Sequence, residues 1–520
     1  MFDVLFTGAT VVDGTGADRF VADVGIDGEH IALVGLAPEG AAARRVVDCS
    51  GACLAPGFID VHTHADHLPF VDPAMGSVLR QGVTSVVVGN CGDSLWPPGE
   101  PDTFGPFLAE LGPDLGRSWV SFGDYLDAID ACRPGANVAG LVGHGSVRAH
   151  VLGSARREAD AGEVRALREH VRDALADGAV GLSSGLIYQP GLFADTDELV
   201  VVASAVAECG GLYTSHIRGE GSTLFRAVAE AVEVGRTADV PVHISHLKLA
   251  ASSTWHRAPE LLAAVHEAGA TGDQYPYTAG LTDLASLLPP WVSPDDFAAL
   301  RADRSRLEHL EDVVQRGEPG WVGAAEGVGW DHLVPVAPVD EGEDSPSLAA
   351  LARARGETPV ETMLDPLEED REMPVLIHAM QEDDVRTIMR DPDIIVASDS
   401  IPVPDDGRWS GLRDHPRSYG TYPRVLGHYV RDEGVLPLET AVRKMTSLPA
   451  ERFGLRDRGR VAEGAFADLT LFDPDGIAGG GDFLRPHAAP RGIRLVLVNG
   501  RVAWDGTTCT RAGRALRRTT

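Results

Sequence analysis

The sequence predicts an α/β fold in which a (β/α)₈ barrel of the TIM type carries a small β-sandwich domain formed by both chain ends. Two observations predict this fold. Through the middle of the chain, apolar runs of four to eight residues alternate with helical stretches, which is typical of a parallel sheet covered on both faces. Both chain ends instead alternate apolar and polar residues between turn signals. A length of 520 residues accommodates one large barrel and a smaller domain.

The small domain is predicted from the similar strand-like residue patterns at the two ends of the chain. The N-terminal strand patterns are FTGATVVDG and DVGIDGEHIALVG, with a turn at Asp27-Gly28, and the C-terminal ones are ADLTLFDPDG and GIRLVLVNGRVAWDG. We therefore assign residues 1–55 and 460–520 to the small β-domain and residues 56–459 to the barrel.

The barrel is predicted from seven or eight repeated strand–helix units. Its strand candidates include TSVVVGN, VAGLVGH, GAVGLSSG, GLYTSHI, VPVHISHLK, ATGDQYPY and DIIVASDS. Its helix candidates include EVRALREHVRDALADG, TDELVVVASAVAECG and TLFRAVAEAVEVGRTADV. Residues 283–350, rich in Pro, Trp and acidic residues, interrupt this alternation and are interpreted as an insertion near the barrel mouth. A lid and a surface excursion without a catalytic role are equally compatible with that segment.

Composition excludes several classes of partner. The net charge of -32 disfavours binding to nucleic acid, because an acidic surface repels phosphate. No apolar run reaches the roughly 18 residues of a membrane helix, and the first residues do not resemble a signal peptide. Six cysteines in so long a chain do not indicate a disulfide framework, so we expect a cytoplasmic protein with reduced thiols and no membrane partner.

Histidines at strand ends predict a metal centre. A strand runs into His62-Thr63-His64, and residues two apart on a strand face the same side. His216 closes a second apolar strand and His246 a third. A single histidine at a strand end is more often structural, but four at the ends of three barrel strands converge on one rim, where barrel active sites lie. Imidazole is a preferred ligand of zinc.

Two further residues follow strands at the same rim. Asp399 comes after IIVAS, where a carboxylate could hold metal-bound water and move its proton, although a turn or helix-capping Asp is the alternative. Cys91 follows SVVVGN, where a thiolate could bind or bridge metals, although a buried small apolar residue is the alternative.

At this point the sequence resembles the amidohydrolase superfamily and, within it, the D-aminoacylase (N-acyl-D-amino-acid deacylase) family. The similar motifs appear in family order from residue 56 to residue 473 and cover most of the chain: PGFIDVHTHAD, GVTSVVVGNCG, GLSSGLIYQPG, GLYTSHIRGEG, ISHLK, DQYPYTAG, ASDS, HPRSYGTYPRVLG, AVRKMTSLPAERFGL and ADLTLFDP. The resemblance implies a metal-dependent hydrolase barrel with a β-domain from both ends and an insertion near the site.

The resemblance also implies residue roles and an activity. Cys91, His216 and His246 would hold one tightly bound Zn²⁺, and His62 and His64 would line a second, weaker metal position that Cys91 could bridge. Asp399 would be the general base and acid. The substrate-binding residues would be Lys248, Arg417, Tyr188 and one of Tyr275 and Tyr277, of which we favour Tyr277. The implied substrate is a small N-acyl-D-amino acid, hydrolysed to a D-amino acid and a carboxylic acid.

The lysine content supports the role of Cys91 independently. Lys248 and Lys444 are the two lysines of the chain, so none lies between His64 and His216. Many hydantoinases and dihydroorotases bridge two metals with a carboxylated lysine in that region, and such a bridge cannot form here. Lys248 lies two residues after His246, on the same strand face, in a chain that otherwise uses Arg. A lysine without a role is the less favoured interpretation.

Alternatives to the implied function remain at this stage. They are a cyclic-amide hydrolase of the hydantoin or dihydropyrimidine type, a biosynthetic N-deacetylase for an unusual amide, and a binding protein without activity. SDS in place of SDG, TAGLT in place of TAGST, and GNCGDS followed by Trp96-Pro97-Pro98 depart from the family pattern and affect the expected substrate preference. We assign structural or supporting roles to His67, His144, His243 and His378. The oligomeric state, the number of metals, the amino acid and the acyl group stay open.

Overall fold

The computed structural model of this protein describes residues 1–98, 119–293, 296–318, 321–323, 326–336, 345–370, 373–404 and 415–518. Parts of the predicted insertion (294–295, 319–320, 324–325 and 337–344) and of the predicted C-terminal segment (519–520) lie outside these residues. In the described residues, no helix is long and apolar enough to cross a membrane.

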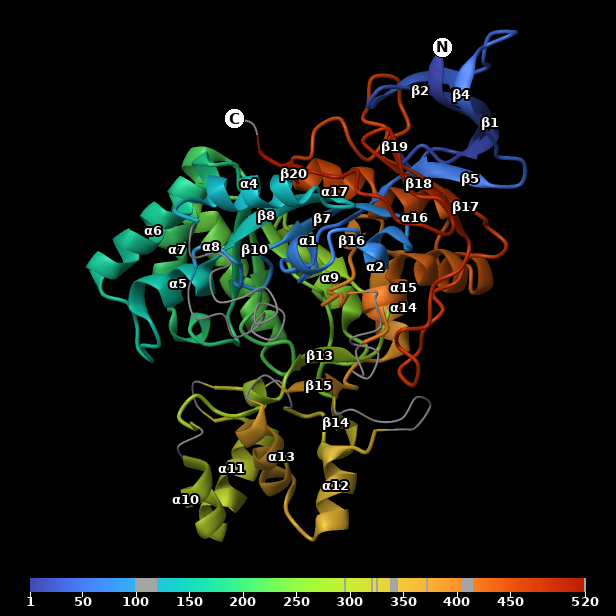
Figure 1. Cartoon of the computed structure of the whole chain (residues 1–520). Coiled ribbons are helices and arrows are strands. Elements are labelled where there is room, and N and C mark those ends of the chain that lie inside the picture. Colours follow the sequence, from blue (N-terminus) through green and yellow to red (C-terminus); the bar gives the residue numbers. More distant parts are fainter. Residues whose placement is uncertain are drawn as a thin grey trace.

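A barrel of parallel strands forms the centre of the molecule (Figure 1). Each strand pairs with the next in chain order, and all of these pairings are parallel. The ring closes between the loops after the first and last strands, where Thr63 and Ser400 form a parallel bridge and the His64 N–H donates to the Ser400 carbonyl over 2.7 Å. The predicted barrel is therefore confirmed. Its strands are β6 (Phe58–Asp60), β7 (Val83–Val88), β8 (Asn137–Gly143), β9 (Gly181–Gly185), β10 (Leu212–His216), β11 (Val242–Ile244), β12 (Thr271–Gln274) and β16 (Ile394–Val396).

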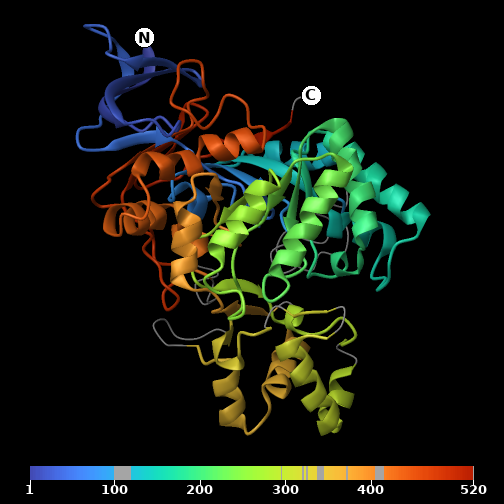
Figure 2. The ribbon, with the colours of Figure 1, turned by 180° about the vertical axis from the view of Figure 1, so that it is seen from behind.

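Amphipathic helices surround the barrel strands (Figures 1 and 2). The helix Ala161–Ala176 shows why they form: Asp160 caps the N-terminus by accepting from the N–H groups of Gly162 and Glu163, and the buried face carries Leu167 and Val171. Three of these helices match the predicted stretches. The helices around the barrel are α1 (Leu68–Val71), α2 (Gly76–Leu79), α4 (Phe122–Cys132), α5 (His144–Leu152), α6 (Ala161–Ala176), α7 (Thr196–Cys209), α8 (Leu224–Ala238), α9 (Ala258–Glu267), α14 (Glu382–Arg390), α15 (Arg417–Arg424), η5 (Val425–Asp432), α16 (Leu438–Met445) and α17 (Ser447–Arg452).

The two chain ends form one small β-domain, as predicted. Its sheet has the strand order β19-β18-β17-β5-β1-β2-β3, with β4 paired to β1, so the antiparallel pair β17–β5 joins the two ends. Apolar side chains from strands of both ends enclose a single core. The β2–β3 hairpin turns at Gly28-Glu29, one residue later than predicted. The strands are β1 (Phe2–Val11), β2 (Phe20–Asp27), β3 (His30–Gly35), β4 (Ala43–Asp48), β5 (Cys53–Pro56), β17 (Leu469–Phe472), β18 (Ile493–Val498) and β19 (Arg501–Trp504). The chain then returns to the barrel, where β20 (Ala515–Leu516) pairs with β8.

The insertion forms a unit with its own apolar core on the side of the barrel opposite the β-domain (Figure 2). An antiparallel sheet of β13 (Gly280–Asp283), β15 (Pro374–Ile377) and β14 (Leu333–Pro335) forms its base. The unit thus extends beyond the predicted 283–350, because the pairing partner of β13 lies near residue 375. Its helices are η2 (Leu284–Leu287), α10 (Phe297–Ala302), α11 (Arg304–Arg316), η4 (Trp330–His332), α12 (Leu348–Arg355) and α13 (Pro359–Glu369).

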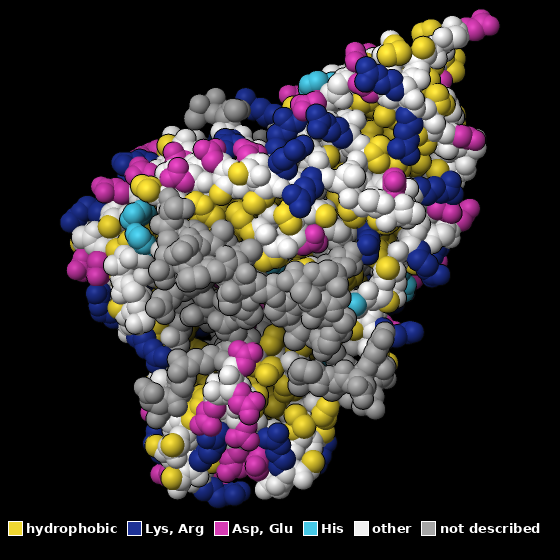
Figure 3. All heavy atoms as spheres, in the orientation of Figure 1, with side chains coloured by type: hydrophobic (Ala, Val, Ile, Leu, Met, Phe, Trp, Pro, Cys, Tyr) yellow, Lys and Arg dark blue, Asp and Glu magenta, His cyan; other side chains and the backbone are white. Residues whose placement is uncertain are grey.

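The acidic excess does not form one continuous patch on the face shown in Figure 3, where acidic and basic side chains are interspersed. On the insertion, for example, Arg301 is paired with both Asp365 and Glu368, at 2.7 and 2.6 Å. Exposed pairs of this kind contribute little to stability.

Candidate metal centre and substrate cavity

The predicted ligands converge at the carboxyl ends of the barrel strands. Two overlapping sets of potential ligand atoms, each with all atoms within 4.8 Å of one another, share Cys91. The first set contains Cys91, His216 and His246, and the second contains His62, His64, Cys91 and Asp399. Cys91 Sγ lies 3.3 Å from His62 Nε2 and 3.5 Å from His246 Nε2. The structure therefore brings together all six side chains that the sequence analysis placed around metal.

Three of these residues have left-handed backbone conformations just after the ends of their strands. Cys91, His246 and Asp399 follow β7, β11 and β16 with φ values of 52°, 35° and 52°. Left-handed backbone in a residue other than Gly costs on the order of 1–3 kcal/mol and is concentrated at functional sites. The neighbouring strand allows this turn because residue 185 is Gly, whose Cβ, if present, would lie 1.9 Å from the Cys91 carbonyl oxygen.

Buried ring nitrogens indicate that the site fits a metal ion. Both ring nitrogens of His216 and Nδ1 of His64 are buried, and among the described residues they have no hydrogen-bond partner. Buried polar atoms are rarely left unpaired, so these nitrogens point to a ligand. A thiolate with imidazoles and a carboxylate is a donor set that suits zinc.

The electrostatics of Cys91 favour the thiolate that metal binding requires. Burial alone raises the pKa of the Cys91 thiol, but the imidazoles of His62, His216 and His246 outweigh burial and hold its pKa well below the ordinary value. Asp399 behaves similarly. Burial raises its pKa, whereas the Arg417 guanidinium, 2.7 Å away, and His246 keep that pKa well below the usual range. Asp399 is thus a carboxylate, 3.4 Å from His62 Nε2 and 3.5 Å from His64 Nε2.

Two carboxylates that the sequence analysis did not single out support the histidines. On β12, Asp273 accepts from His243 Nε2 over 2.8 Å and from the His246 N–H over 2.9 Å, and it lies 3.3 Å from His62 Nδ1. Glu220 lies 2.9 Å from His246 Nδ1. Such outer carboxylates orient imidazole ligands and fix their tautomers. An acidic residue inside the strand ATGDQYPY, one residue before the strand ends at Gln274, was the available signal for Asp273.

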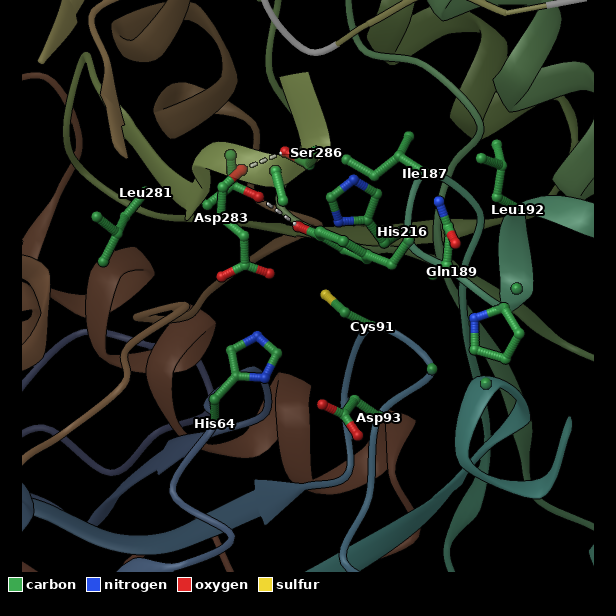
Figure 4. A pocket seen from close by; sticks show the side chains of 18 of the residues that line it. His64, Cys91, Asp93, Ile187, Gln189, Leu192, His216, Leu281, Asp283 and Ser286 are labelled. Atoms are coloured by element: carbon green, nitrogen blue, oxygen red, sulfur yellow. Dashed lines mark hydrogen bonds between the residues drawn. The ribbon is translucent and has the colours of Figure 1, made fainter. Parts of the chain in front are cut away.

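A cavity of about 960 Å³ opens beside the candidate metal centre. Figure 4 shows His64, Cys91 and His216 directed into it from different elements, with Asp93 and Asp283 on its wall. Tyr188, Lys248, Tyr275 and Arg417 line it, as do residues of the insertion such as Leu281 and Trp321. The insertion therefore contributes to the wall of the cavity.

The predicted substrate-binding residues are held by partners within the protein. Lys248 Nζ donates to Glu220 Oε1 over 2.5 Å, and Arg417 pairs with Asp399. Tyr188 forms a hydrogen bond with Thr282 over 3.1 Å, and its ring centroid lies 5.0 Å from that of His216.

The preference for Tyr277 over Tyr275 requires correction. Tyr277 donates to the Pro416 carbonyl over 3.2 Å, packs beneath Arg424 and does not line the cavity. Tyr275 lines the cavity with Lys248 and Arg417 near its ring, and its buried hydroxyl has no hydrogen-bond partner among the described residues. Alternation along the chain leaves both tyrosines on the same face, so tertiary contacts rather than periodicity separate them.

The remaining histidines make supporting contacts. His144 is buried against Glu198 at 2.8 Å, His67 pairs with the Pro402 carbonyl, and His378 packs against Phe483. The residues that depart from the family pattern lie at the barrel closure and on the cavity wall. Ser400 forms hydrogen bonds with Thr63 and Ser398 at the barrel closure, whereas Leu281 and Asp93 face the cavity.

A parallel barrel with a cysteine–histidine–carboxylate centre at its carboxyl rim defines the class of metal-dependent barrel hydrolases. Comparison with known proteins agrees. Residues 45–503 match the model of the amidohydrolase family. The chain is 37% identical to D-aminoacylase from Alcaligenes xylosoxydans xylosoxydans, over 100% of this chain and 98% of that protein, and 37% identical to N-acyl-D-glutamate deacylase from the same organism, over 99% and 96%. This chain therefore belongs to the amidohydrolase family, in its D-aminoacylase group.

A solved structure shows the same fold. N-acyl-D-glutamate deacylase from Bordetella bronchiseptica, complexed with zinc and a phosphonate inhibitor that mimics the tetrahedral intermediate, superimposes with a TM-score of 0.82 at 34% identity, over 99% of this chain and 100% of that one. That protein holds zinc, and the present chain has a candidate metal site whose donors suit that ion.

Proposed function

We propose that this chain hydrolyses the amide bond of N-acyl-D-amino acids with the help of Zn²⁺. The observation that carries the proposal is that Cys91 is shared by two ligand sets, with the Asp399 carboxylate in the second. The full-length similarity to D-aminoacylase and to the D-glutamate and D-aspartate deacylases supports the substrate class.

In this proposal, Cys91, His216 and His246 hold the tightly bound Zn²⁺, and His62 and His64 line a weaker second position. When bound, zinc would supply a Lewis acid and lower the pKa of water to about 7. Asp399 accepts the proton of the attacking water and later donates it to the leaving amine. Its depressed pKa suits the first of these steps, since the group begins as a carboxylate.

The substrate α-carboxylate is proposed to bind at Lys248 and Arg417, whose cationic groups lie 5.5 and 4.9 Å from the centroid of the Tyr275 ring. Both cations are buried, so a carboxylate that reaches them forms charge-assisted hydrogen bonds of high strength. Tyr188, whose ring lies beside that of His216, would donate to the carbonyl oxygen as negative charge develops. Because the substrate α-carboxylate is held at the cations and its acyl carbonyl at the metal, the substituents on Cα can take only one arrangement, which favours one enantiomer.

A substrate panel with metal analysis tests the proposal. The zinc content of the purified protein is measured, and hydrolysis is compared for N-acetyl-D-amino acids, their L enantiomers and 5-substituted hydantoins. We expect bound zinc and turnover of the D series. Preferential turnover of hydantoins would contradict the proposal and support the cyclic-amide alternative, which the absence of a mid-barrel lysine disfavours.

A larger amide substrate is the second candidate, favoured by the cavity volume of about 960 Å³. Adding N-acyl compounds with larger acyl groups to the same panel decides between the two. A clear preference for a large amide without an α-carboxylate would favour a biosynthetic deacetylase.

A further inference from the structure

Glu220 lies at the junction between the candidate metal centre and the proposed carboxylate-binding lysine. Its Oε1 is 2.5 Å from Lys248 Nζ and 2.9 Å from His246 Nδ1, and these two nitrogens are 2.7 Å apart. The three polar atoms form a closed triangle in a buried region. Neither metal binding by His246 nor carboxylate binding by Lys248 by itself accounts for this arrangement.

The triangle matters because Glu220 and Lys248 favour opposite tautomers of the His246 imidazole. A neutral imidazole carries one proton, on Nδ1 or on Nε2. When Nδ1–H donates to Glu220, the lone pair lies on Nε2, the nitrogen that faces Cys91 and the metal position. When Nδ1 instead accepts from the Lys248 ammonium, the proton lies on Nε2 and blocks metal binding there.

We propose that Glu220 is a positioning residue that links metal binding at Cys91, His216 and His246 to carboxylate binding at Lys248. A substrate carboxylate that engages Lys248 draws the ammonium away from His246 Nδ1, and Glu220 then holds His246 in the metal-binding tautomer. By reciprocity, bound metal favours carboxylate binding by the same factor. This inference rests on the proposed function, which assigns the substrate carboxylate to Lys248.

The other half of the centre lacks this arrangement. His62 Nδ1 faces Asp273, whose other contacts come from His243 and the His246 backbone. The lysine ammonium thus contacts the carboxylate behind the first ligand set. Both carboxylates are charged: burial raises the pKa of Glu220, but Lys248 and His246 outweigh burial and lower it below its ordinary value.

The first test measures the Zn²⁺ dissociation constant of the full-length protein by competition with a chromophoric chelator. Glu220→Gln keeps the shape of the side chain but removes its charge, and we expect the dissociation constant to rise about 10- to 100-fold. Glu230→Gln is the matched control, because Glu230 is similarly buried (16% exposed, against 18% for Glu220) and pairs with Arg218 rather than with a ligand. An unchanged dissociation constant in Glu220→Gln would overturn the proposal.

The second test examines the link itself by a double-mutant cycle. Lys248→Met removes the competing donor, so we expect tighter Zn²⁺ binding in the wild-type background and a larger change in the Glu220→Gln background, where no carboxylate opposes the ammonium at His246. The same fold-change in both backgrounds would show that Lys248 acts independently of Glu220 and would overturn the link.

The third test needs no variant. D-leucine, a product of the proposed reaction, is expected to lower the Zn²⁺ dissociation constant of the wild-type protein several-fold, whereas D-leucinamide, which lacks the carboxylate, is not. Equal responses would overturn the carboxylate part of the inference. Turnover is assayed in parallel, so the two proposals can fail separately. If the enzyme is active but the double-mutant cycle shows no coupling between Glu220 and Lys248, the link alone is contradicted. If the cycle shows coupling but the protein does not hydrolyse N-acyl-D-amino acids, the proposed function is contradicted.

Discussion

At the scale of single residues, the site consists of buried charges that compensate one another. Asp399 is paired with Arg417, and Glu220 with Lys248. Removing one member of a buried pair leaves an uncompensated charge, which is strongly destabilising. The roles proposed for these residues therefore have to be tested with substitutions that preserve shape and with metal binding measured beside activity.

Asp399→Asn tests the proton-transfer role. The amide retains the shape of the side chain but cannot accept a proton from water, so we expect kcat to fall by about 10²- to 10⁴-fold. Zinc bound by Cys91, His216 and His246 should remain, as measured by metal analysis. Asp384→Asn, at a buried carboxylate that accepts from the His256 N–H, is the control. Turnover of Asp399→Asn within tenfold of the wild type would exclude the role.

Lys248→Ala tests recognition of the α-carboxylate. Loss of a hydrogen bond to a charged group costs about 1.5–3 kcal/mol, so we expect kcat/KM for N-acyl-D-amino acids to fall about 10- to 100-fold. The corresponding N-acyl-D-amino acid amides lack the carboxylate and serve as the control. An equal loss on both kinds of substrate would contradict carboxylate binding by Lys248.

At the scale of elements, the strand ends position the ligands and glycines make room for them. The loop after β7 carries Cys91 against β9, and a Cβ at position 185 would lie 1.9 Å from the Cys91 carbonyl oxygen. Backbone at that distance cannot adjust as a flexible side chain can. The composition of β9, which supplies no ligand, therefore determines where the β7 loop places its thiolate.

Gly185→Ala is accordingly expected to displace Cys91 and weaken metal binding. The expected result is a lower zinc content after dialysis and a lower thermal midpoint than in the wild type. Gly123→Ala is the control, because a Cβ there would meet its nearest neighbour, Ser121 Oγ, at 3.3 Å. Full zinc content in Gly185→Ala would show that the loop is more tolerant than its packing indicates.

Lys444 gives a prediction on pH. On α16, it is buried and donates to the carbonyls of Met389 and Asp391, at the end of α14. Burial lowers its pKa from 10.5 to about 7. Between about pH 7 and 10.5 the folded state has therefore lost a proton that the unfolded chain still binds, so stability from this group rises with pH across that window.

The measurement compares thermal midpoints of the wild type and Lys444→Met from pH 6 to pH 9.5. We expect the thermal midpoint of the wild type to rise relative to that of the variant as the pH increases above about 7. Parallel profiles would mean that the lysine keeps its proton in the folded state.

At the scale of the whole molecule, the barrel carries the β-domain on one side and the insertion on the other (Figure 1). A buried polar network ties the β-domain to the barrel: Asn499 donates from Nδ2 to Asn137 Oδ1 over 2.8 Å and from its N–H to Asp468 Oδ1 over 2.7 Å. Asn137 is the first residue of β8, the strand that receives the C-terminal pairing of Ala515 and Leu516. The chain ends thus support the side of the barrel away from the cavity.

Asn137→Ala tests that connection. Asn499 and Asp468 would each lose a buried partner, so we expect the free energy of unfolding to fall by about 1–3 kcal/mol. Calorimetry should show that the β-domain unfolds at a lower temperature than in the wild type, with kcat unchanged at 25 °C. Thr507→Ala, at an exposed turn of the same domain, is the control. A calorimetric profile like that of the wild type would show that the network does not couple the two parts.

The sequence by itself determined the barrel, the β-domain from both ends and the family, because period-two strands, 3.6-period helices and residues at strand ends are local patterns. It also indicated Cys91, the four histidines and Asp399, since strand ends of a parallel barrel share one rim. Only the tertiary structure decided that Tyr275 rather than Tyr277 faces the cavity, that Asp273 and Glu220 stand behind the histidines, and that the insertion extends to β15. These features depend on contacts between residues distant in the chain, and no local periodicity encodes them.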